Sequence, residues 1–179
     1  MRNSEIDAFG DILWLNYTDA YSELNLKDYV MLKYHAYRFP EGILMWTNMD
    51  AIIFPKHLAE FYGEEQIAET NEQFLPPTIF GHCVCDGKCD GDSAVAPIRT
   101  FNNPWFMSRS AWPREKYPGY CIAFTVIFSH GVPARLVDAA DGMPKQLMRD
   151  VWIDDVLITG VYRQAGRVCI CDSLIGNPI

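Results

Sequence analysis

The apolar stretch CIAFTVIF, residues 121–128, predicts the central strand of the fold. No charged residue interrupts it. A short continuous apolar run of this kind is typical of a buried strand, whereas a membrane span needs about 18 apolar residues. No apolar run in the chain is longer. We therefore expect a sheet built around residues 121–128 and no membrane span within the sequence.

Helix and strand patterns follow the central stretch. Ser129 is of a residue type that caps helices, and the sequence predicts a helix over 132–140. A second helix is expected over 155–165, and RVCIC at 167–171 predicts the last strand.

Strands and helices also alternate upstream. ILWLNY at 12–17 predicts a buried strand, and GILMW at 42–46 predicts another. Between them a helix is expected over 26–37, capped by Asn25, and a further helix is expected after the second strand, over 55–62. The order strand, helix, strand, helix favours a parallel α/β unit with a right-handed crossover.

Composition narrows the class of protein. The chain has 179 residues, of which 49% are hydrophobic and 21% charged, which suits a single globular domain over 1–179 rather than a disordered chain. Its formal net charge is −8, and no Lys/Arg cluster occurs, which argues against a nucleic-acid-binding surface.

Residues 64–104 have no clear period and many turn residues, so we expect a long Cys-rich excursion there. The chain has six cysteines, and this segment contains a group of metal-ligand types: His82, Cys83, Cys85 and Cys89. Their spacing is not the paired C-x-x-C of structural zinc sites. If the protein is in an oxidising compartment, disulfides explain the cysteines more simply. In a reducing compartment, a zinc site becomes the better explanation.

Two adjacent aspartates, Asp154 and Asp155, interrupt the apolar run VWIDDVLITG at 151–160. Burying unpaired carboxylates is costly. The start of a helix resolves the conflict, because Asp154 can cap it and Asp155 can lie in the positive first turn. Asp155 would then face a cleft as a candidate general base. The alternative is an acidic first turn without chemistry.

Two loops carry further candidate residues. Asn48 and Asp50, in TNMD after a predicted strand, offer oxygen ligands for a divalent cation, or they form an ordinary turn. In SAWPREKYPGYC at 110–121, Tyr117 and Tyr120 can contact sugars through ring faces and hydroxyls, or they fill the edge of the core.

Taken in chain order, four segments of the sequence resemble those of one family, the β-1,3-galactosyltransferase-like group, glycosyltransferase family 31. The matching segments are FGDIL at 9–13 with LNLK at 24–27, ILMWTNMDAIIF at 43–54, PWFMS at 104–108 with KYPGYC at 116–121 and Ser129, and IDDVLITG at 153–160. The resemblance extends from about Phe9 to Gly166 and is carried by the four segments together.

The resemblance implies a fold class and an activity. The fold would be α/β, with the nucleotide-sugar glycosyltransferase-type (GT-A-like) open mixed sheet and flanking helices, missing its first strands. The chain would be a partial catalytic domain of an N-terminally truncated or divergent member. Such hexosyltransferases usually transfer galactose or an N-acetylhexosamine from a UDP-sugar to a glycan acceptor through a β-1,3 linkage with inversion. They commonly use Mn²⁺ and lie on the luminal side of the Golgi membrane, held by an N-terminal anchor that is absent here.

The resemblance also assigns residue roles. Asp155 would be the catalytic base, with Asp154 as its acidic neighbour. Trp105, Tyr117 and Tyr120 would line the substrate cleft. Asp50 would be the metal ligand, with Asn48 as a second oxygen donor.

Two departures from the family pattern support an alternative. Asn48-Met49-Asp50 replaces three acidic residues, and methionine is a poor ligand for a hard cation. Ile122–Thr125 is bulkier than the glycine-containing strand of the family, so it can fill room that a sugar needs. The alternative is a catalytically inactive relative that binds glycans or a partner protein.

Overall fold

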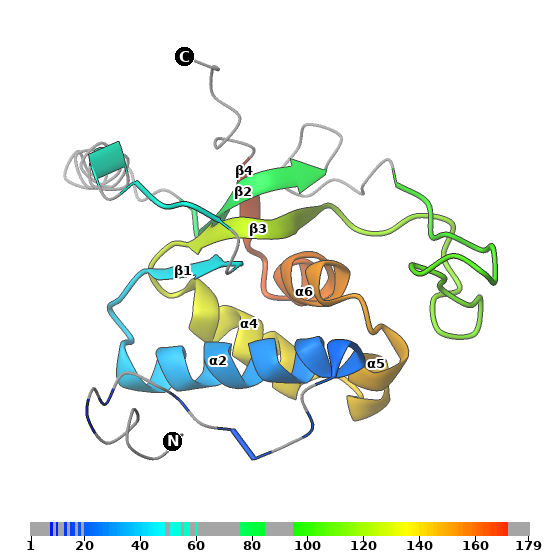
Figure 1. The fold of residues 1–179 in the computed structure, drawn as a ribbon, viewed down its shortest axis with the longest axis horizontal. Coiled ribbons are helices and arrows are strands. Elements are labelled where there is room, and N and C mark those ends of the chain that lie inside the picture. Colours follow the sequence, from blue (N-terminus) through cyan, green and yellow to red (C-terminus); the bar gives the residue numbers. More distant parts are fainter. Residues whose placement is uncertain are drawn as a thin grey trace.

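The computed structural model describes residues 8, 10, 13, 15–16, 18, 20–48, 51–54, 56–57, 60, 76–84 and 95–171. Their elements are, in chain order, the 3-10 helix η1 (Tyr21–Glu23), α2 (Leu24–Arg38), β1 (Leu44–Thr47), β2 (Thr78–Val84), β3 (Tyr120–Phe128), α4 (Val132–Asp141), α5 (Lys145–Asp150), the π-helix η2 (Val156–Tyr162), α6 (Arg163–Ala165) and β4 (Cys169–Cys171). Helices α2 and α4 lie side by side on one face of the sheet, below it in Figure 1.

The described strands form one sheet in the order β1-β3-β2-β4. Strand β3 is antiparallel to both β1 and β2, and β2 is parallel to β4, so the sheet is mixed. Val126 and Phe128 of β3 are fully buried, which confirms the central strand predicted from CIAFTVIF. An open mixed sheet with flanking helices is the fold class that the resemblance implies.

The predicted parallel unit at the N-terminal end is wrong. β1 is antiparallel to its neighbour, and the one parallel pair among the described strands is β2 with β4. Leu13, Leu15 and Asn16 lie outside any strand, and the other residues of ILWLNY are not among those described. Leu13 is 45% exposed, so the apolar run is not packed as a buried strand there.

Strand β2 lies inside the segment that the sequence assigns to an irregular excursion. Its residues are TIFGHCV, and the register with β3 shifts between Gly81 and His82. This break in the ladder explains why no regular strand pattern is visible in the sequence. A disulfide joins Cys83 of β2 to Cys121 of β3, so Cys83 is not a zinc ligand. The described residues contain no group of three or more metal-ligating side chains.

The helix predicted over 26–37 is confirmed as α2, but the face that it buries is partly polar. Tyr34 and Tyr37, which are three residues apart on this helix, are 41% and 83% exposed. The buried positions are Asn25, Asp28 and Leu32. Asn25 lies inside the helix and not at its cap, so α2 presents two polar side chains to the interior.

Helix α4 covers the predicted range, but Ser129 does not cap it with its side chain. The Ser129 hydroxyl accepts a hydrogen bond from the Thr78 amide at 2.9 Å, and Gly131 precedes the helix. The family-like segment PWFMS forms no strand; it begins in a turn and has a single bridge, between Ile98 and Phe106. The predicted last strand is confirmed as β4.

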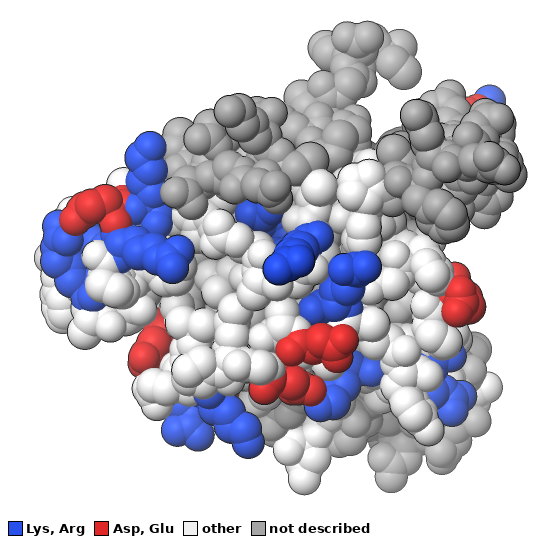
Figure 2. Space-filling model, turned by 180° about the vertical axis from the view of Figure 1, so that it is seen from behind, with Lys and Arg blue, Asp and Glu red and all other residues white. Residues whose placement is uncertain are grey.

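Two expectations from the composition concern a membrane span and a charged binding surface. No helix of the described residues is long and apolar enough to cross a membrane. On the face seen in Figure 2, Lys and Arg side chains are interspersed with Asp and Glu side chains among uncharged residues. This face therefore has no uniform charge of either sign.

Candidate active site

A cavity of about 270 Å³ brings together four of the predicted site residues: Trp105, Tyr117, Tyr120 and Asp155. Its remaining lining residues are Val95, Ala96, Ile98, Ile122, Ile153 and Val156. Among the described residues that line the cavity, only Asp155 has a carboxyl group. The cavity thus combines aromatic and aliphatic walls with a single acidic side chain, a composition typical of small-ligand sites.

The acidic pair lies in the first turn of a helical run. This run begins at Asp154, one residue earlier than predicted, and continues through η2 and α6 to Ala165. The Ile153 carbonyl accepts a hydrogen bond from the Leu157 amide at 3.0 Å, so Ile153, not Asp154, occupies the cap position. Both carboxylates therefore lie near the positive end of the helix, which stabilises negative charge.

Burial raises the pKa of Asp154, and hydrogen bonds from its own amide and that of Asp155 oppose the rise. The pKa of Tyr120 is also raised. Burial is the larger cause, and the negative charge of Asp155 is the smaller one. The Tyr120 phenol is therefore neutral at physiological pH. It can donate a hydrogen bond in the same cavity that Asp155 lines.

Thr159 ties the aspartate turn to the central strand. Its Oγ1 accepts a hydrogen bond from the Cys121 amide at 2.8 Å. The same oxygen lies 3.0 Å from the Cys121 carbonyl and 2.7 Å from the Asp155 carbonyl, and its proton serves either acceptor. Thr159 is fully buried. Its hydroxyl thus connects the start of β3 with the backbone of the candidate base.

Because Gly160 has no side chain, η2 can pack closely against the segment that leads into β3. A Cβ at Gly160 would lie 3.1 Å from Pro118 Cγ and 3.2 Å from Tyr120 Cβ, tighter than ordinary contacts. The two family-like segments KYPGYC and IDDVLITG therefore pack directly on each other, although they are distant in sequence.

An aromatic group forms one wall of the cavity. Trp105 stacks on Trp152, with ring centroids 5.8 Å apart and an interplanar angle of 4°. Tyr21 contacts both rings edge-on, at 5.9 Å and 6.3 Å. Trp105 is still 44% exposed, so one indole surface is available to a ligand.

Tyr117 also lines the cavity. It is buried, and its ring lies 5.6 Å from Trp112 and 6.2 Å from Tyr120. Burial raises the pKa of Tyr117 to about 12; the charge of Arg99 lowers it to a smaller extent, and Tyr120 adds a small rise. Arg99 also holds the loop in place, because its guanidinium donates to the carbonyls of Met107, Trp112 and Arg114 at 2.8–2.9 Å.

Of the two predicted metal ligands, Asp50 is outside the described residues, and Asn48 is not among the residues that line this cavity. Asn48 follows β1, and its amide donates to the Phe124 carbonyl at 3.2 Å. Phe124 lies two residues along β3 from Ile122, which lines the cavity, and two residues span roughly 7 Å of strand. Asn48 is exposed at that end of β1.

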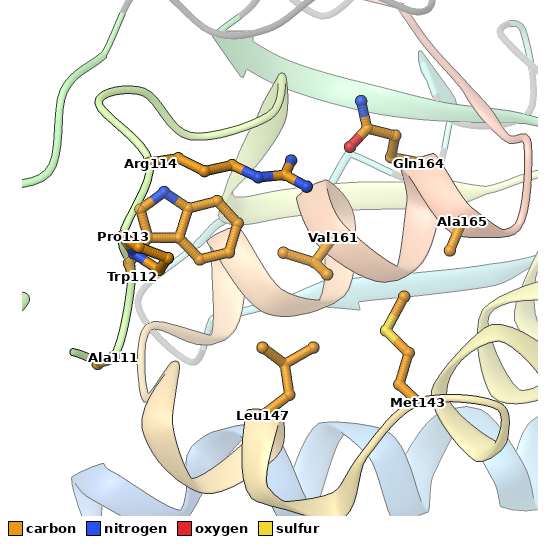
Figure 3. A pocket seen from close by; sticks show the side chains of 9 residues that line it. All are labelled: Ala111, Trp112, Pro113, Arg114, Met143, Leu147, Val161, Gln164 and Ala165. Carbon is orange, nitrogen blue, oxygen red and sulfur yellow. The ribbon is translucent and has the colours of Figure 1, made fainter. Parts of the chain in front are cut away.

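A second cavity, of about 470 Å³, is larger but chemically plainer (Figure 3). The loop residue Arg114 extends along one side of it, and Met143, Leu147 and Val161 form an apolar floor. The described residues that line it include no predicted site residue and no carboxyl group. The smaller cavity is therefore the better candidate for chemistry.

Sequence reasoning missed three residues of the site: Tyr21, Asp28 and Trp152. Burial, followed by the charges of Asp154 and Asp155, raises the pKa of Tyr21, which places its hydroxyl near the acidic pair. Trp152 adjoins the aspartates in the quoted run, so its position was a usable signal. Tyr21, Asn25 and Asp28 are spaced by four and three residues, the period of one helix face, but polar residues at this spacing resemble a solvated surface. Of the bulky stretch Ile122–Thr125, Ile122 lines the cavity, whereas the side chain of Phe124 is 61% exposed.

Comparison with known proteins gives one family. The family model described as Galactosyltransferase matches residues 1–172. Beta-1,3-galactosyltransferase 5 of Pan troglodytes is 24% identical over 153 residues, which are 84% of this chain and 46% of that protein. The Homo sapiens protein of the same name is also 24% identical, with 84% and 44% covered. Beta-1,3-galactosyltransferase brn of Drosophila melanogaster is 22% identical over 150 residues, with 83% and 42% covered. The chain spans less than half the length of these relatives.

Proposed function

The chain belongs to the galactosyltransferase family, and we propose on that premise that its Asp155 cavity catalyses hexosyl transfer. The donor would be a UDP-sugar carrying galactose or an N-acetylhexosamine, and the acceptor would be a glycan hydroxyl joined through a β-1,3 linkage. The observation that carries the proposal is the meeting of Asp155, Tyr120 and Trp105 in one cavity, formed by the family-like segments.

The proposed reaction is a direct displacement with Asp155 as general base. The acceptor hydroxyl transfers its proton to the Asp155 carboxylate while its oxygen bonds to C1 of the donor sugar. The C1–oxygen bond to the diphosphate breaks on the opposite face, UDP leaves with the electron pair, and the configuration at C1 inverts. A positioned carboxylate contributes about 10²–10⁴-fold to such a step.

The aromatic wall would orient the sugar. The exposed surface of Trp105 suits the apolar face of a pyranose ring, and Trp152 stacked behind it keeps the indole plane fixed. The neutral Tyr120 hydroxyl is suited to hydrogen-bond a sugar or acceptor hydroxyl beside Asp155. Tyr117 lines the same cavity, and its buried ring would hold Tyr120 in place.

Mn²⁺ is part of the proposal, with Asp50 and Asn48 as its protein ligands. A carboxylate and an amide oxygen are the donors that divalent hard cations accept. The metal would offset charge on the departing diphosphate. Asn48 adjoins the strand that lines the cavity, which supports this location.

We also propose the luminal side of the Golgi membrane as the compartment. The Cys83–Cys121 disulfide supports this, because disulfides persist in oxidising compartments. The cross-link lies beside the cavity, since Cys121 follows Tyr120 directly.

The test of the base is an Asp155→Asn variant, with Asp138→Asn on the exposed surface of α4 as the matched control. UDP release is measured with candidate UDP-sugars and acceptors in the presence of Mn²⁺. We expect the Asp155 variant to lose roughly 10²-fold or more in kcat and the control to keep its rate. Full activity in the Asp155 variant would refute the assignment.

One observation favours a second candidate function, a non-catalytic glycan- or partner-binding relative. Ile122 projects bulk into a cavity of about 270 Å³, slightly below the range of about 300–1,000 Å³ usual for ligand sites. Calorimetry with UDP and Mn²⁺ separates the two functions. Metal-dependent UDP binding supports the transferase, and glycan binding without UDP binding supports the alternative.

A further inference from the structure

The N-terminal part of α2 faces the backbone segment that carries the acidic pair. Asn25 and Asp28 are one helical turn apart, and both are buried. The Asn25 Nδ2 donates to the Val151 carbonyl at 3.4 Å and to the Met148 carbonyl. One polar side chain of α2 therefore already holds the segment that leads to Asp154.

Asp28 makes the second connection, to Asp154 itself. Asp28 is only 3% exposed, and no donor of the described residues reaches its Oδ2. Its side-chain hydrogen-bond partner is the Asp154 carboxyl group. Two carboxylates cannot share a hydrogen bond unless one carries a proton.

The surroundings decide which carboxyl group carries that proton. Asp154 accepts hydrogen bonds from its own amide and from that of Asp155, which favours its ionised form. Burial, followed by the charges of Asp154 and Asp155 and the hydrogen bond to Asp154, raises the pKa of Asp28 to about 8, while Lys27 lowers it slightly. Asp28 is therefore the acid and Asp154 the acceptor at neutral pH.

We propose that Asp28 is a positioning residue, which holds Asp154 by a carboxyl–carboxylate hydrogen bond and thereby orients the adjacent Asp155 toward the cavity. The inference rests on the proposed function of Asp155 and deepens it. Asp154 is held on one side by backbone amides and on the other by α2, so the turn that it shares with Asp155 is fixed from both sides. Above about pH 8 Asp28 loses its proton, and the carboxylates of Asp28, Asp154 and Asp155 then repel one another, with Lys27 as the nearby positive charge.

The first part of the test does not depend on catalysis. Carboxyl carbon NMR of the full chain follows Asp28 and Asp155 as the pH is raised from about 5 to 10. We expect Asp28 to titrate near pH 8, and Asp154→Asn to lower its pKa by removing the partner charge. Asp28→Leu should shift the Asp155 resonance, whereas Asp28→Asn, whose amide still donates to Asp154, should leave it in place. An Asp28 titration that ignores Asp154→Asn, or an Asp155 resonance that ignores Asp28→Leu, overturns the proposal.

The second part measures transfer from a UDP-sugar as a function of pH. Wild-type kcat should fall above about pH 8, and the kcat of Asp28→Asn should not show this alkaline decline. Asp28→Leu should lose about 10- to 100-fold in kcat with a smaller change in KM, the scale expected for a misplaced catalytic group. An unchanged alkaline decline in Asp28→Asn contradicts the positioning role. If the wild type lacks transferase activity, the proposed function fails, and the NMR spectra still decide the role of Asp28.

Discussion

Replacing Thr159 by Val tests the connection between the aspartate turn and the central strand. Valine keeps the shape and the methyl group of threonine and removes only the hydroxyl. The Cys121 amide, now hydrogen-bonded to that hydroxyl at 2.8 Å, would be left buried without its partner. Leaving a buried donor unsatisfied costs about 1–3 kcal/mol. The carbonyls of Cys121 and Asp155 would also lose the shared proton.

We therefore expect Thr159→Val to reduce the free energy of unfolding by about 2 kcal/mol. For a domain of this size that corresponds to a fall in Tm of roughly 4–8 °C. Urea unfolding followed by tryptophan fluorescence gives the first quantity, and a melting curve gives the second. Thr159→Ser is the matched control for the hydroxyl, since it keeps the hydrogen bond and loses a buried methyl group.

Amide hydrogen exchange separates the two variants even if their stabilities are alike. The Cys121 amide should exchange faster than in the wild type in Thr159→Val and remain protected in Thr159→Ser. A Val variant with wild-type stability and a protected Cys121 amide would refute the reasoning. It would mean that the contact of Thr159 with β3 contributes packing and not a hydrogen bond.

Two further predictions concern close approach and pH. Gly160→Ala should lose about 1–2 kcal/mol of stability, because overpacking against Pro118 and Tyr120 outweighs the gain in helix propensity. Gly142→Ala, whose nearest contact would be 3.4 Å, should be neutral or slightly stabilising in the same denaturation assay, and equal losses would count against this account. The pKa of Asp28 rises from its ordinary value of 3.8 to about 8 on folding, so between these pH values the folded state binds the extra proton. The free energy of unfolding of the wild type relative to Asp28→Asn should then fall as pH rises, by at most about 1.4 kcal/mol per pH unit; a flat difference would contradict the shift.

The central strand and helix α4 after it were predictable because their patterns are local. CIAFTVIF is uninterrupted, and a short uninterrupted apolar run leaves few alternatives to a buried strand. The helix over 132–140 has an amphipathic spacing and a terminating glycine, and α4 follows that range closely. Neither prediction needed information about partners in the fold.

Pairing direction and strand β2 were not predictable for the opposite reason. Whether neighbouring strands are parallel depends on contacts that are distant in sequence, and an alternation of strand and helix does not determine it. β2 contains Gly81 and a register shift, so its pattern is irregular even though Ile79 is fully buried. The disulfide from Cys83 to Cys121 and the hydrogen bonds of the sheet hold it in place.

The candidate site also contains residues that the sequence could identify and one that it could not. Asp155, Tyr120 and Trp105 were found because the resemblance identifies short segments with fixed residue types. Asp28 was missed, since a buried aspartate on a helix cannot be distinguished by spacing from a solvated one. Its place became visible only with the partner, Asp154, which is 126 positions later in the sequence.

Stability alone does not explain why carboxyl groups meet at this junction. Burial raises the pKa values of both Asp28 and Asp154, so keeping Asp154 ionised opposes folding. Apolar side chains of similar volume at such positions are often neutral or stabilising. The arrangement instead fixes one backbone turn from two directions, through Asp28 on α2 and through Thr159 on η2, and the residue at that turn is the cavity carboxylate Asp155. A cost to folding beside a precisely held acidic group is the pattern of a functional site, in which activity is kept at the expense of stability. By this reasoning Asp28→Asn should be at least as stable as the wild type at pH 8, where the wild-type proton is half lost.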